Sequence, residues 1–209
     1  MAVTPLMIDL TEQHAVIVGG GRVAERRAAT LLAGGAFVTV ISPHLSNGLQ
    51  REWEKGQILW KQKLFEATDI YDAFIVIVAT DNPKVNESVI NAASPNMLVN
   101  AAGEAEQGNV VFPSFFRRGK LSISVSTNGA SPQLSAKIKK DLQGIYSENY
   151  EGYLDFLAES RKLIKRSRLD PHYQQLLLKE LLSESFFDEN KQLSAMVWFR
   201  KLAKEGEAG

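Results

Sequence analysis

A glycine-rich run near the N-terminus has the residue types and spacing of a phosphate-binding loop. Gly19-Gly20-Gly21-Arg22-Val23-Ala24 fits the pattern G-x-G-x-x-G/A, in which a backbone turn and a helix N-terminus cradle a pyrophosphate. Gly19 permits the tight turn, Gly21 lets the backbone approach the phosphates, and Ala24 allows a helix to pack closely on a strand. The helix then offers free N–H groups and its positive dipole end to the anion. A glycine-rich turn without a ligand is the alternative, and the elements on either side favour dinucleotide binding.

The end of the second expected strand, at residues 37–41, is where this fingerprint usually places an acidic residue for the ribose hydroxyls. Ser42 occupies that position and can make one hydrogen bond to a ribose. The backbone of Pro43 and His44, which follow, can lie along the adenosine. Because no arginine follows directly to bind a 2′-phosphate, we expect NAD rather than NADP.

Thr80 and Asp81 follow another expected core strand, at residues 74–79. They therefore stand at the carboxyl edge of a parallel sheet, where ligands bind in such folds. They can flank the nicotinamide half of a dinucleotide. They can equally cap a helix expected at residues 86–93, and the sequence leaves both interpretations open.

Strand-like and helical patterns alternate through the first hundred residues. Short apolar, β-branched runs predict strands at residues 15–18, 37–41, 58–61, 74–79 and 98–100. Helical spacing predicts helices at residues 22–33, 49–55 and 86–93. Strand, helix and strand at these spacings indicate a Rossmann-like parallel sheet.

The pattern changes after residue 109. Strand-like runs at residues 110–112 and 121–126 are separated by a turn at residues 117–120, and a polar loop then opens a helix at residues 133–142. Helices are expected at residues 150–167, 172–182 and 191–204. The fold class is therefore α/β: a parallel sheet, then a small α+β region, then an all-α C-terminal domain. The expected boundaries are residues 1–112, 113–146 and 147–209.

Composition narrows the function classes. The chain has no cysteine and three histidines, so disulfides, thiolate metal sites and a cysteine nucleophile are excluded and no metal site is expected. Lys and Arg number 24 and so do Asp and Glu, which argues against nucleic-acid binding through bulk charge. The longest apolar stretch, residues 73–79, is far shorter than the roughly 18 residues that span a bilayer. The N-terminus has no basic segment typical of a secretory signal, so we expect a cytoplasmic protein without membrane contact.

Several motifs taken together resemble one family. The glycine loop with Glu25-Arg26-Arg27, then Ala79-Thr80-Asp81, then Val99-Asn100, then Ser126-Thr127-Asn128-Gly129-Ala130-Ser131-Pro132 occur in the order found in precorrin-2 dehydrogenases, the sirohaem synthase N-terminal type. The resemblance covers residues 5–142. Some members of this family are also sirohydrochlorin ferrochelatases.

This resemblance implies a reaction and a site. NAD⁺ would accept a hydride from the tetrapyrrole precorrin-2 to give sirohydrochlorin, in a homodimer held together through residues 113–146. The family's NAD contacts would fall on Arg22, Val23, Pro43 and His44. The tetrapyrrole cleft would be lined by Asn100, Ser126, Thr127, Asn128 and Ser131.

One position departs from the family pattern. Members commonly read V-N-V-V-D, and that aspartate is tied to both activities, but here the run is Val99-Asn100-Ala101-Ala102-Gly103-Glu104. Gly103 holds the place of the aspartate, and Glu104 is the candidate for receiving the proton. Because metal insertion needs a group that takes the pyrrole protons, the departure predicts a dehydrogenase with weak or no chelatase activity.

Other residues fit a substrate that carries eight carboxylates. Five cations fall within one expected helix, where they can bind carboxylates or form a solvated face: Arg161, Lys162, Lys165, Arg166 and Arg168. Two other functions compete with the family interpretation. A regulatory NAD-binding module would usually keep an acidic residue after the second strand, and a dehydrogenase of another small substrate would show a Lys, His or Tyr acid–base group.

Overall fold

The computed structural model describes residues 3–103 and 105–207. The chain divides into two compact units, Met1–Phe112 (unit 1) and Pro113–Gly209 (unit 2). Each unit is described by itself. No helix within the described part of the chain is both long and apolar enough to cross a membrane.

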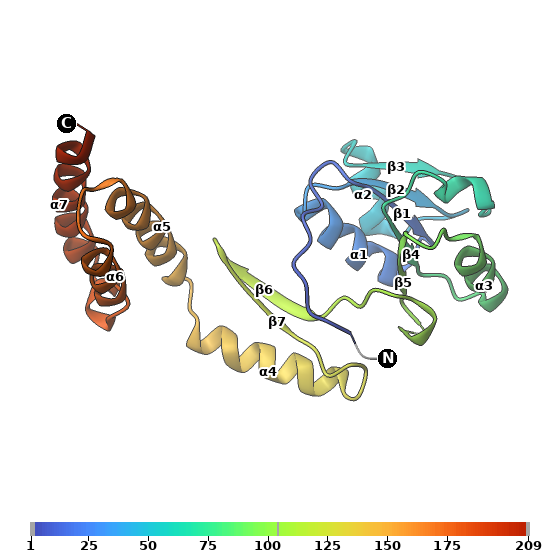
Figure 1. Ribbon diagram of the computed structural model, residues 1–209. Helices are drawn as coiled ribbons and strands as arrows, with labels where there is room; N and C mark the ends of the chain where they lie inside the picture. Colours follow the sequence, from blue (N-terminus) through green and yellow to red (C-terminus); the bar gives the residue numbers. More distant parts are fainter. Residues whose placement is uncertain (1–2, 104, 208–209) are drawn as a thin grey trace. The chain divides into compact units, whose positions relative to one another are not determined.

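Unit 1 is a five-stranded parallel sheet with helices on both faces (Figure 1). The strand order is β3-β2-β1-β4-β5, which is the doubly wound arrangement expected from the alternating pattern. Its elements are β1 His14–Val18, α1 Arg22–Ala33, β2 Phe37–Ile41, α2 Asn47–Glu54, β3 Ile58–Lys61, η1 Ala67–Ile70, β4 Ile75–Val78, α3 Pro83–Ala92, β5 Leu98–Ala101 and η2 Ala105–Gln107.

The central strands are apolar throughout because both faces of the sheet are covered. In β1, Ala15 and Ile17 pack in a core that contains Ala28 and Leu31 of α1. Val16 and Val18 point to the opposite core, which contains residues of α3 and η1. Successive side chains of a strand alternate between faces, so the short run after His14 supplies both cores at once.

The free edge of β5 is covered by the segment that leaves the sheet. The Asn109 backbone N–H donates to the Val99 carbonyl oxygen at 2.9 Å. Its side-chain oxygen accepts from the Val99 N–H at 2.7 Å, and its side-chain nitrogen donates to the Met97 carbonyl at 2.9 Å. These contacts hold residues 109–112 against the sheet, where Val110 and Phe112 pack on the core. Residues 110–112 do not form a strand, so the prediction of one there is wrong.

Unit 2 begins with an antiparallel hairpin, β6 Ser114–Arg118 and β7 Leu121–Val125. The turn between them is tighter than predicted, because Gly119 adopts a positive φ of 51° and leaves Arg117 and Arg118 inside β6. Phe116, opposite Ile123, is buried, and α4 Pro132–Ile145 packs on the hairpin.

The rest of unit 2 is helical: α5 Tyr150–Arg166, α6 Pro171–Glu180, η3 Glu184–Phe187 and α7 Glu189–Glu207. These helices enclose an aromatic core that includes Tyr153, Phe156, Phe186 and Phe199. The Tyr153 hydroxyl donates to the Leu181 carbonyl at 2.7 Å, which satisfies its polar end inside that core.

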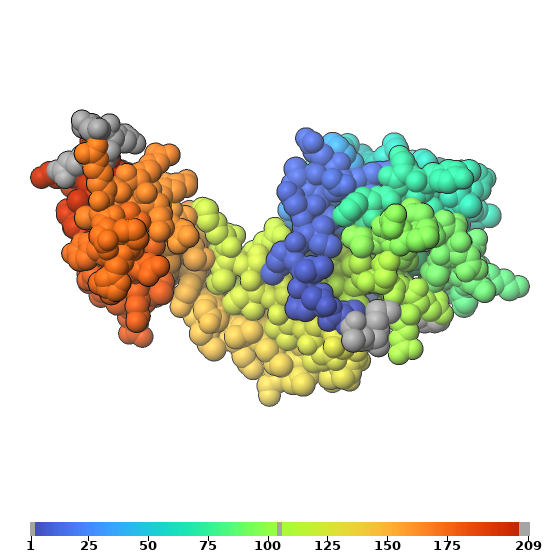
Figure 2. All heavy atoms as spheres, in the orientation of Figure 1, coloured from blue at the N-terminus to red at the C-terminus, as the bar shows by residue number. Residues whose placement is uncertain are grey.

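The segment before β1 lies on the surface of unit 1, where Figure 2 shows it in dark blue. Leu6 and Met7 are each 76% exposed there. The segment is nevertheless fixed near β1, since Leu10 packs against the core and Glu12 donates its N–H to the Gly35 carbonyl at 2.9 Å.

Candidate active site

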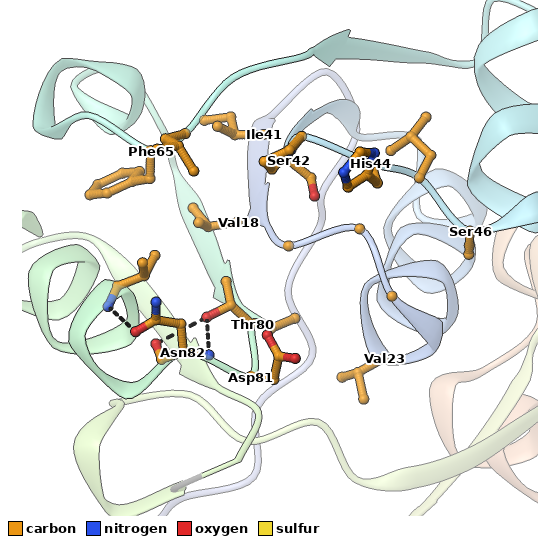
Figure 3. A pocket seen from close by; sticks show the side chains of 18 of the residues that line it. Val18, Val23, Ile41, Ser42, His44, Ser46, Phe65, Thr80, Asp81 and Asn82 are labelled. Carbon is orange, nitrogen blue, oxygen red and sulfur yellow. Dashed lines mark hydrogen bonds between the residues drawn. The ribbon is translucent and has the colours of Figure 1, made fainter.

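A cleft of about 760 Å³ opens at the carboxyl edge of the parallel sheet in unit 1 (Figure 3). This is the edge where open parallel sheets bind their ligands. Its walls come from the loops that follow β1, β2, β3, β4 and β5. The lining residues are Val18–Val23, Ile41–Ser46, Lys63–Phe65, Ala79–Asn82, Val85, Ala102 and Gly103.

The glycine loop forms the floor of this cleft, and its glycines meet two different requirements. Gly19 has a φ of +122°, and a Cβ there would lie 2.2 Å from the Ala79 carbonyl oxygen. A Cβ at Gly20 would lie 1.9 Å from the His44 carbonyl oxygen. A Cβ at Gly21 would contact nothing within 4 Å, so this position borders open space. The first two glycines let the loops pack closely, and the third keeps the cradle free for a ligand.

The N-terminus of α1 is not capped by a side chain. Its N-cap residue is Gly21, which has no side chain to offer. In contrast, Ser46 caps α2 by accepting from the Leu49 N–H, and Asn82 caps α3 by accepting from the N–H groups of Lys84 and Val85. The uncapped first turn of α1 therefore presents backbone donors and a positive dipole end to the cleft. These groups fit the pyrophosphate of a dinucleotide.

A hydrogen-bond network fixes the loop after β2 to the glycine loop. The Ser46 N–H donates to the Gly20 carbonyl at 2.7 Å, and the Ser46 hydroxyl donates to the Glu25 carboxylate at 2.6 Å. Sequence reasoning missed Ser46, and it placed Glu25 in the family motif without giving it a structural role. A serine three residues before an apolar helix position is a capping signal that could have identified Ser46, whereas its contact with Glu25 spans 21 residues.

The residues after β2 border the cleft opposite those after β4. Figure 3 shows Ser42 and His44 on one side, and Thr80 and Asp81 on the other. Ser42 is only 9% exposed, and its carbonyl accepts from the Trp60 indole N–H at 2.9 Å. The Pro43 carbonyl accepts from the Gln62 side chain at 3.3 Å. The loop thus has a fixed path, although no carboxylate stands at the end of β2.

Thr80 is engaged at the start of α3. Its hydroxyl donates to the Asn86 side-chain oxygen at 2.6 Å and accepts from the Asn82 N–H at 3.1 Å. The helix begins at Pro83, earlier than residue 86, because Asn82 is the N-cap. Asp81 does not cap it and lines the cleft.

The loop after β3 completes the wall with Lys63, Leu64 and Phe65, which sequence reasoning missed. The Lys63 ammonium lies 2.9 Å from a Glu66 carboxylate oxygen and 3.1 Å from a carboxylate oxygen of buried Asp69. Hydrogen bonding to Glu66 raises the pKa of Lys63. Burial raises the pKa of Asp69, but the Glu66 N–H and the two lysines outweigh it, so its pKa lies below the ordinary value.

The end of β5 and the loop after it contain Asn100 and Gly103, and Gly103 is the position at which the sequence departs from the family pattern. Asn100 is 3% exposed, and its side-chain nitrogen donates to the Val110 carbonyl at 2.8 Å, while its side-chain oxygen has no hydrogen-bond partner. Gly103 is exposed and lines the cleft, and a Cβ there would contact nothing within 4 Å. Glu104 lies outside the described residues.

The polar loop of unit 2 satisfies many of its own polar groups. Ser126 accepts from the Asn128 N–H at 3.1 Å, and Thr127 accepts from the Ser131 N–H at 3.1 Å. Ser131 caps α4 by accepting from the Leu134 N–H at 3.2 Å. Asn128 has a φ of 51°, as expected of a tight turn. The structure thus brings Ser126, Thr127, Asn128 and Ser131 together in unit 2, and Asn100 belongs to unit 1.

The five cations expected on one helix are exposed in α5 and the residues after it. Of these, Lys162 lies 3.5 Å from Glu159 in the same helix. The described part of the chain contains no group of three or more His, Cys, Asp or Glu side chains that could hold a metal ion.

Comparisons with known proteins find matches along most of the chain. Residues 6–114 match the family described as "Putative NAD(P)-binding", residues 118–144 match "Sirohaem biosynthesis protein central" and residues 150–194 match "SirC C-terminal domain". The precorrin-2 dehydrogenase of Priestia megaterium is 38% identical over 182 residues, which is 87% of this chain and 90% of that protein. That of Bacillus subtilis (strain 168) is 37% identical over 164 residues, 78% of this chain and 98% of that protein.

The chain belongs to the precorrin-2 dehydrogenase family. The solved structure of SirC, precorrin-2 dehydrogenase, matches with a TM-score of 0.83 and 35% identity, over 95% of this chain and 100% of that one. The siroheme synthase of Xylella fastidiosa (strain M12) is 33% identical over 166 residues, which is 78% of this chain but 35% of that protein.

Membership of the precorrin-2 dehydrogenase family confirms the expected resemblance, the fold class and the enzyme class, an oxidoreductase of sirohaem biosynthesis. It also assigns the sheet of unit 1 to an NAD(P)-binding domain. A regulatory nucleotide-binding module is not favoured, since the relatives that match most of the chain are enzymes.

Proposed function

We propose that this chain oxidises precorrin-2 with NAD⁺, giving sirohydrochlorin, NADH and a proton. The observation that carries the proposal is the uncapped N-terminus of α1, which faces an open cleft beside a glycine that nothing crowds. Similarity to precorrin-2 dehydrogenases over most of both chains supports the choice of substrate.

The residues of the cleft divide the dinucleotide among them. Gly19, Gly21 and the first-turn residues Arg22 and Val23 hold the pyrophosphate. Ala24, which is fully buried, serves the motif by letting α1 pack closely on the sheet. Ser42, Pro43 and His44 border the adenosine, and Thr80 and Asp81 border the nicotinamide side. When bound, the nicotinamide supplies the hydride acceptor, and the task of the protein is to orient the macrocycle toward it.

NAD is proposed over NADP because the β2 side of the cleft offers no unpaired cation among its described residues. Lys63 lines the cleft, but its ammonium is engaged by Glu66 and Asp69. Arg22 also lines the cleft, but it stands at the start of α1, where it is assigned to the pyrophosphate. A 2′-phosphate near Ser42 would therefore find no free cation in the described loops after β2 and β3.

The tetrapyrrole is proposed to contact Asn100 and the loop residues Ser126, Thr127, Asn128 and Ser131. Glu104 is the proposed acceptor of the proton released with the hydride, with water as the alternative. The proposed organisation is a cytoplasmic homodimer in which residues 1–112 bind NAD, residues 113–146 form the dimer and residues 147–209 form a helical domain.

Chelatase activity is proposed to be weak or absent, because Gly103 stands where members of this family commonly carry an aspartate. A Cβ at Gly103 would meet nothing within 4 Å, so Gly103→Asp is a suitable variant for restoring the carboxylate. Iron insertion into sirohydrochlorin should be slow in the natural chain and faster in Gly103→Asp. If the natural chain inserts iron at the rate of a bifunctional relative, the proposal of weak or absent chelatase activity is wrong.

The main test is an anaerobic absorption spectrum of the purified protein with precorrin-2 and NAD⁺. We expect the NADH absorbance and the sirohydrochlorin spectrum to rise together. If neither appears while the protein is folded and binds NAD⁺ by calorimetry, precorrin-2 is not the substrate.

A further inference from the structure

Arg27 is a partly buried cation without an ionic partner. It lies on α1 beyond the first turn, and no hydrogen bond or ion pair joins its guanidinium to any other described residue. Its Nε atom is buried and unsatisfied. The guanidinium carbon lies 4.4 Å from the centre of the Phe112 ring. A stacking contact compensates only part of the hydration that such a group loses.

Burial disfavours the charged form of this side chain. Loss of hydration, together with the neighbouring charge of Arg26, lowers the pKa of Arg27 to about 10. The group still carries its charge at neutral pH. Since a buried charge without a partner is costly, this position is stabilised when an anion arrives.

A second unsatisfied group borders the same stretch of chain. The Asn100 side chain donates to the Val110 carbonyl, and its own oxygen has no partner at 3% exposure. Asn100 shares a face of β5 with Leu98, which packs in the same core as Val110 and Phe112. Arg27 contacts Phe112 and Asn100 contacts Val110, in one stretch of chain. The free amide oxygen of Asn100 calls for a hydrogen-bond donor, so Arg27 alone favours an anion here.

We propose that Arg27 binds a carboxylate side chain of the tetrapyrrole. The inference rests on the proposed function, because precorrin-2 carries eight carboxylates. The Nε atom is closed to solvent, so a carboxylate meets the terminal N–H groups of the guanidinium. These groups can bind one carboxylate in a bidentate manner, most strongly where water is scarce. Arg27 is thus a substrate-binding residue on the helix whose first turn, at Arg22 and Val23, lines the cofactor cleft.

The test compares Arg27→Met with Arg26→Met. Methionine keeps the long apolar stem and the contact with Phe112 but removes the charge, and Arg26 is an exposed arginine on the same helix. For Arg27→Met we expect KM for precorrin-2 to rise about ten- to a hundredfold with a smaller change in kcat. The Kd for NAD⁺, measured by calorimetry, should not move. Arg27→Lys should recover part of the loss, and Arg26→Met should behave as the natural chain.

A binding measurement separates this inference from the proposed function. Uroporphyrin, an unreactive octacarboxylate, is titrated into each variant and its fluorescence followed. Its Kd should rise in Arg27→Met by a factor similar to that for KM. Equal Kd values for Arg27→Met and Arg26→Met would overturn the inference and leave the dehydrogenase proposal intact. Failure of the natural chain to oxidise precorrin-2 would overturn the proposed function instead.

The alternative source of the anion is a carboxylate of a second copy of this chain. If Arg27→Met shifts the monomer–dimer equilibrium in sedimentation but leaves the uroporphyrin Kd unchanged, the carboxylate belongs to a second chain and the inference is wrong. Thermal unfolding of each variant shows whether the change in binding reflects a loss of folded protein.

Discussion

Two helices of this chain follow polar loops, and they differ in what satisfies their first turns. The loop before α1 consists of glycines, and no side chain caps the helix. The loop before α4 consists of hydroxyl and amide side chains, and Ser131 and Thr127 accept hydrogen bonds from its backbone. Both helices have positive dipole ends, but only the first leaves its donors open.

The difference separates binding by backbone from binding by side chains. At α1 the absence of side chains lets an anion approach the N–H groups directly. At α4 the internal hydrogen bonds fix the loop, so any ligand must use the lone pairs and donors that remain. An open helix start gains stability from its ligand, whereas a closed one is stable without it.

The largest effect is expected from Gly19→Ala, which should disrupt the glycine loop before the uncapped N-terminus of α1. A Cβ at Gly19 would lie 2.2 Å from the Ala79 carbonyl at a φ of +122°, so the strand and loop must separate. We expect the free energy of unfolding in urea to fall by roughly 3 kcal/mol and NAD⁺ binding to be lost. Gly56→Ala, with a φ of +70° and no neighbour within 4 Å, should cost about 1 kcal/mol and leave binding unchanged. Normal NAD⁺ binding by Gly19→Ala would show that the loop geometry is not required.

Gly21→Asp should convert the open start into a closed one. A Cβ at Gly21 would meet nothing within 4 Å. An aspartate at this N-cap position can accept from the first-turn N–H groups of α1, as Ser131 does in α4. We expect stability to rise by up to about 1 kcal/mol, while NAD⁺ affinity falls at least a hundredfold because the carboxylate occupies the phosphate site and repels its charge. Calorimetry and urea unfolding measure the two effects. A variant that is more stable and still binds NAD⁺ would break the distinction between the two helix starts.

Ser131→Ala should open the start of α4. Removing the cap leaves the Leu134 N–H without its 3.2 Å partner, and we expect unfolding to become easier by about 1 kcal/mol. Ser131→Gly places at this N-cap the residue type found at the start of α1, and it should lower the free energy of unfolding by only a few tenths of a kcal/mol. If the serine instead serves only the substrate, KM for precorrin-2 will rise in both variants without a change in stability.

The smallest effect is expected at η1, a third helix N-terminus, which the carboxylates of Glu66 and Asp69 cap. Asp69 accepts from the Glu66 N–H at 2.9 Å, and its lowered pKa means that the folded state favours its charged form. Its stabilisation is therefore present above the unfolded value of about 3.9 and is lost as pH falls through the lower folded value. The stability difference between the natural chain and Asp69→Asn should shrink between pH 7 and pH 3. A constant gap in urea unfolding across that range would contradict this assignment.

The sheet of unit 1 and the glycine loop could be predicted because their signals are local. A buried parallel strand reads as a continuous apolar run, and the loop has fixed spacing. The position of β6 could not, since Phe116 is buried by α4 and the exposed Arg117 beside it reads as a turn. The Ser46–Glu25 contact and the wall from Lys63 to Phe65 depend on packing between distant segments, which spacing alone does not encode.

The Asn109 side chain has a consequence for the behaviour of the protein in concentrated solution. β5 is an edge strand, and such strands offer unpaired donors and acceptors on which another chain can assemble. Asn109 occupies the Met97 carbonyl and both backbone groups of Val99. At the opposite edge, β3 has only four residues. The sheet therefore gives little opportunity for edge-to-edge aggregation, and a single asparagine protects the side from which the chain departs.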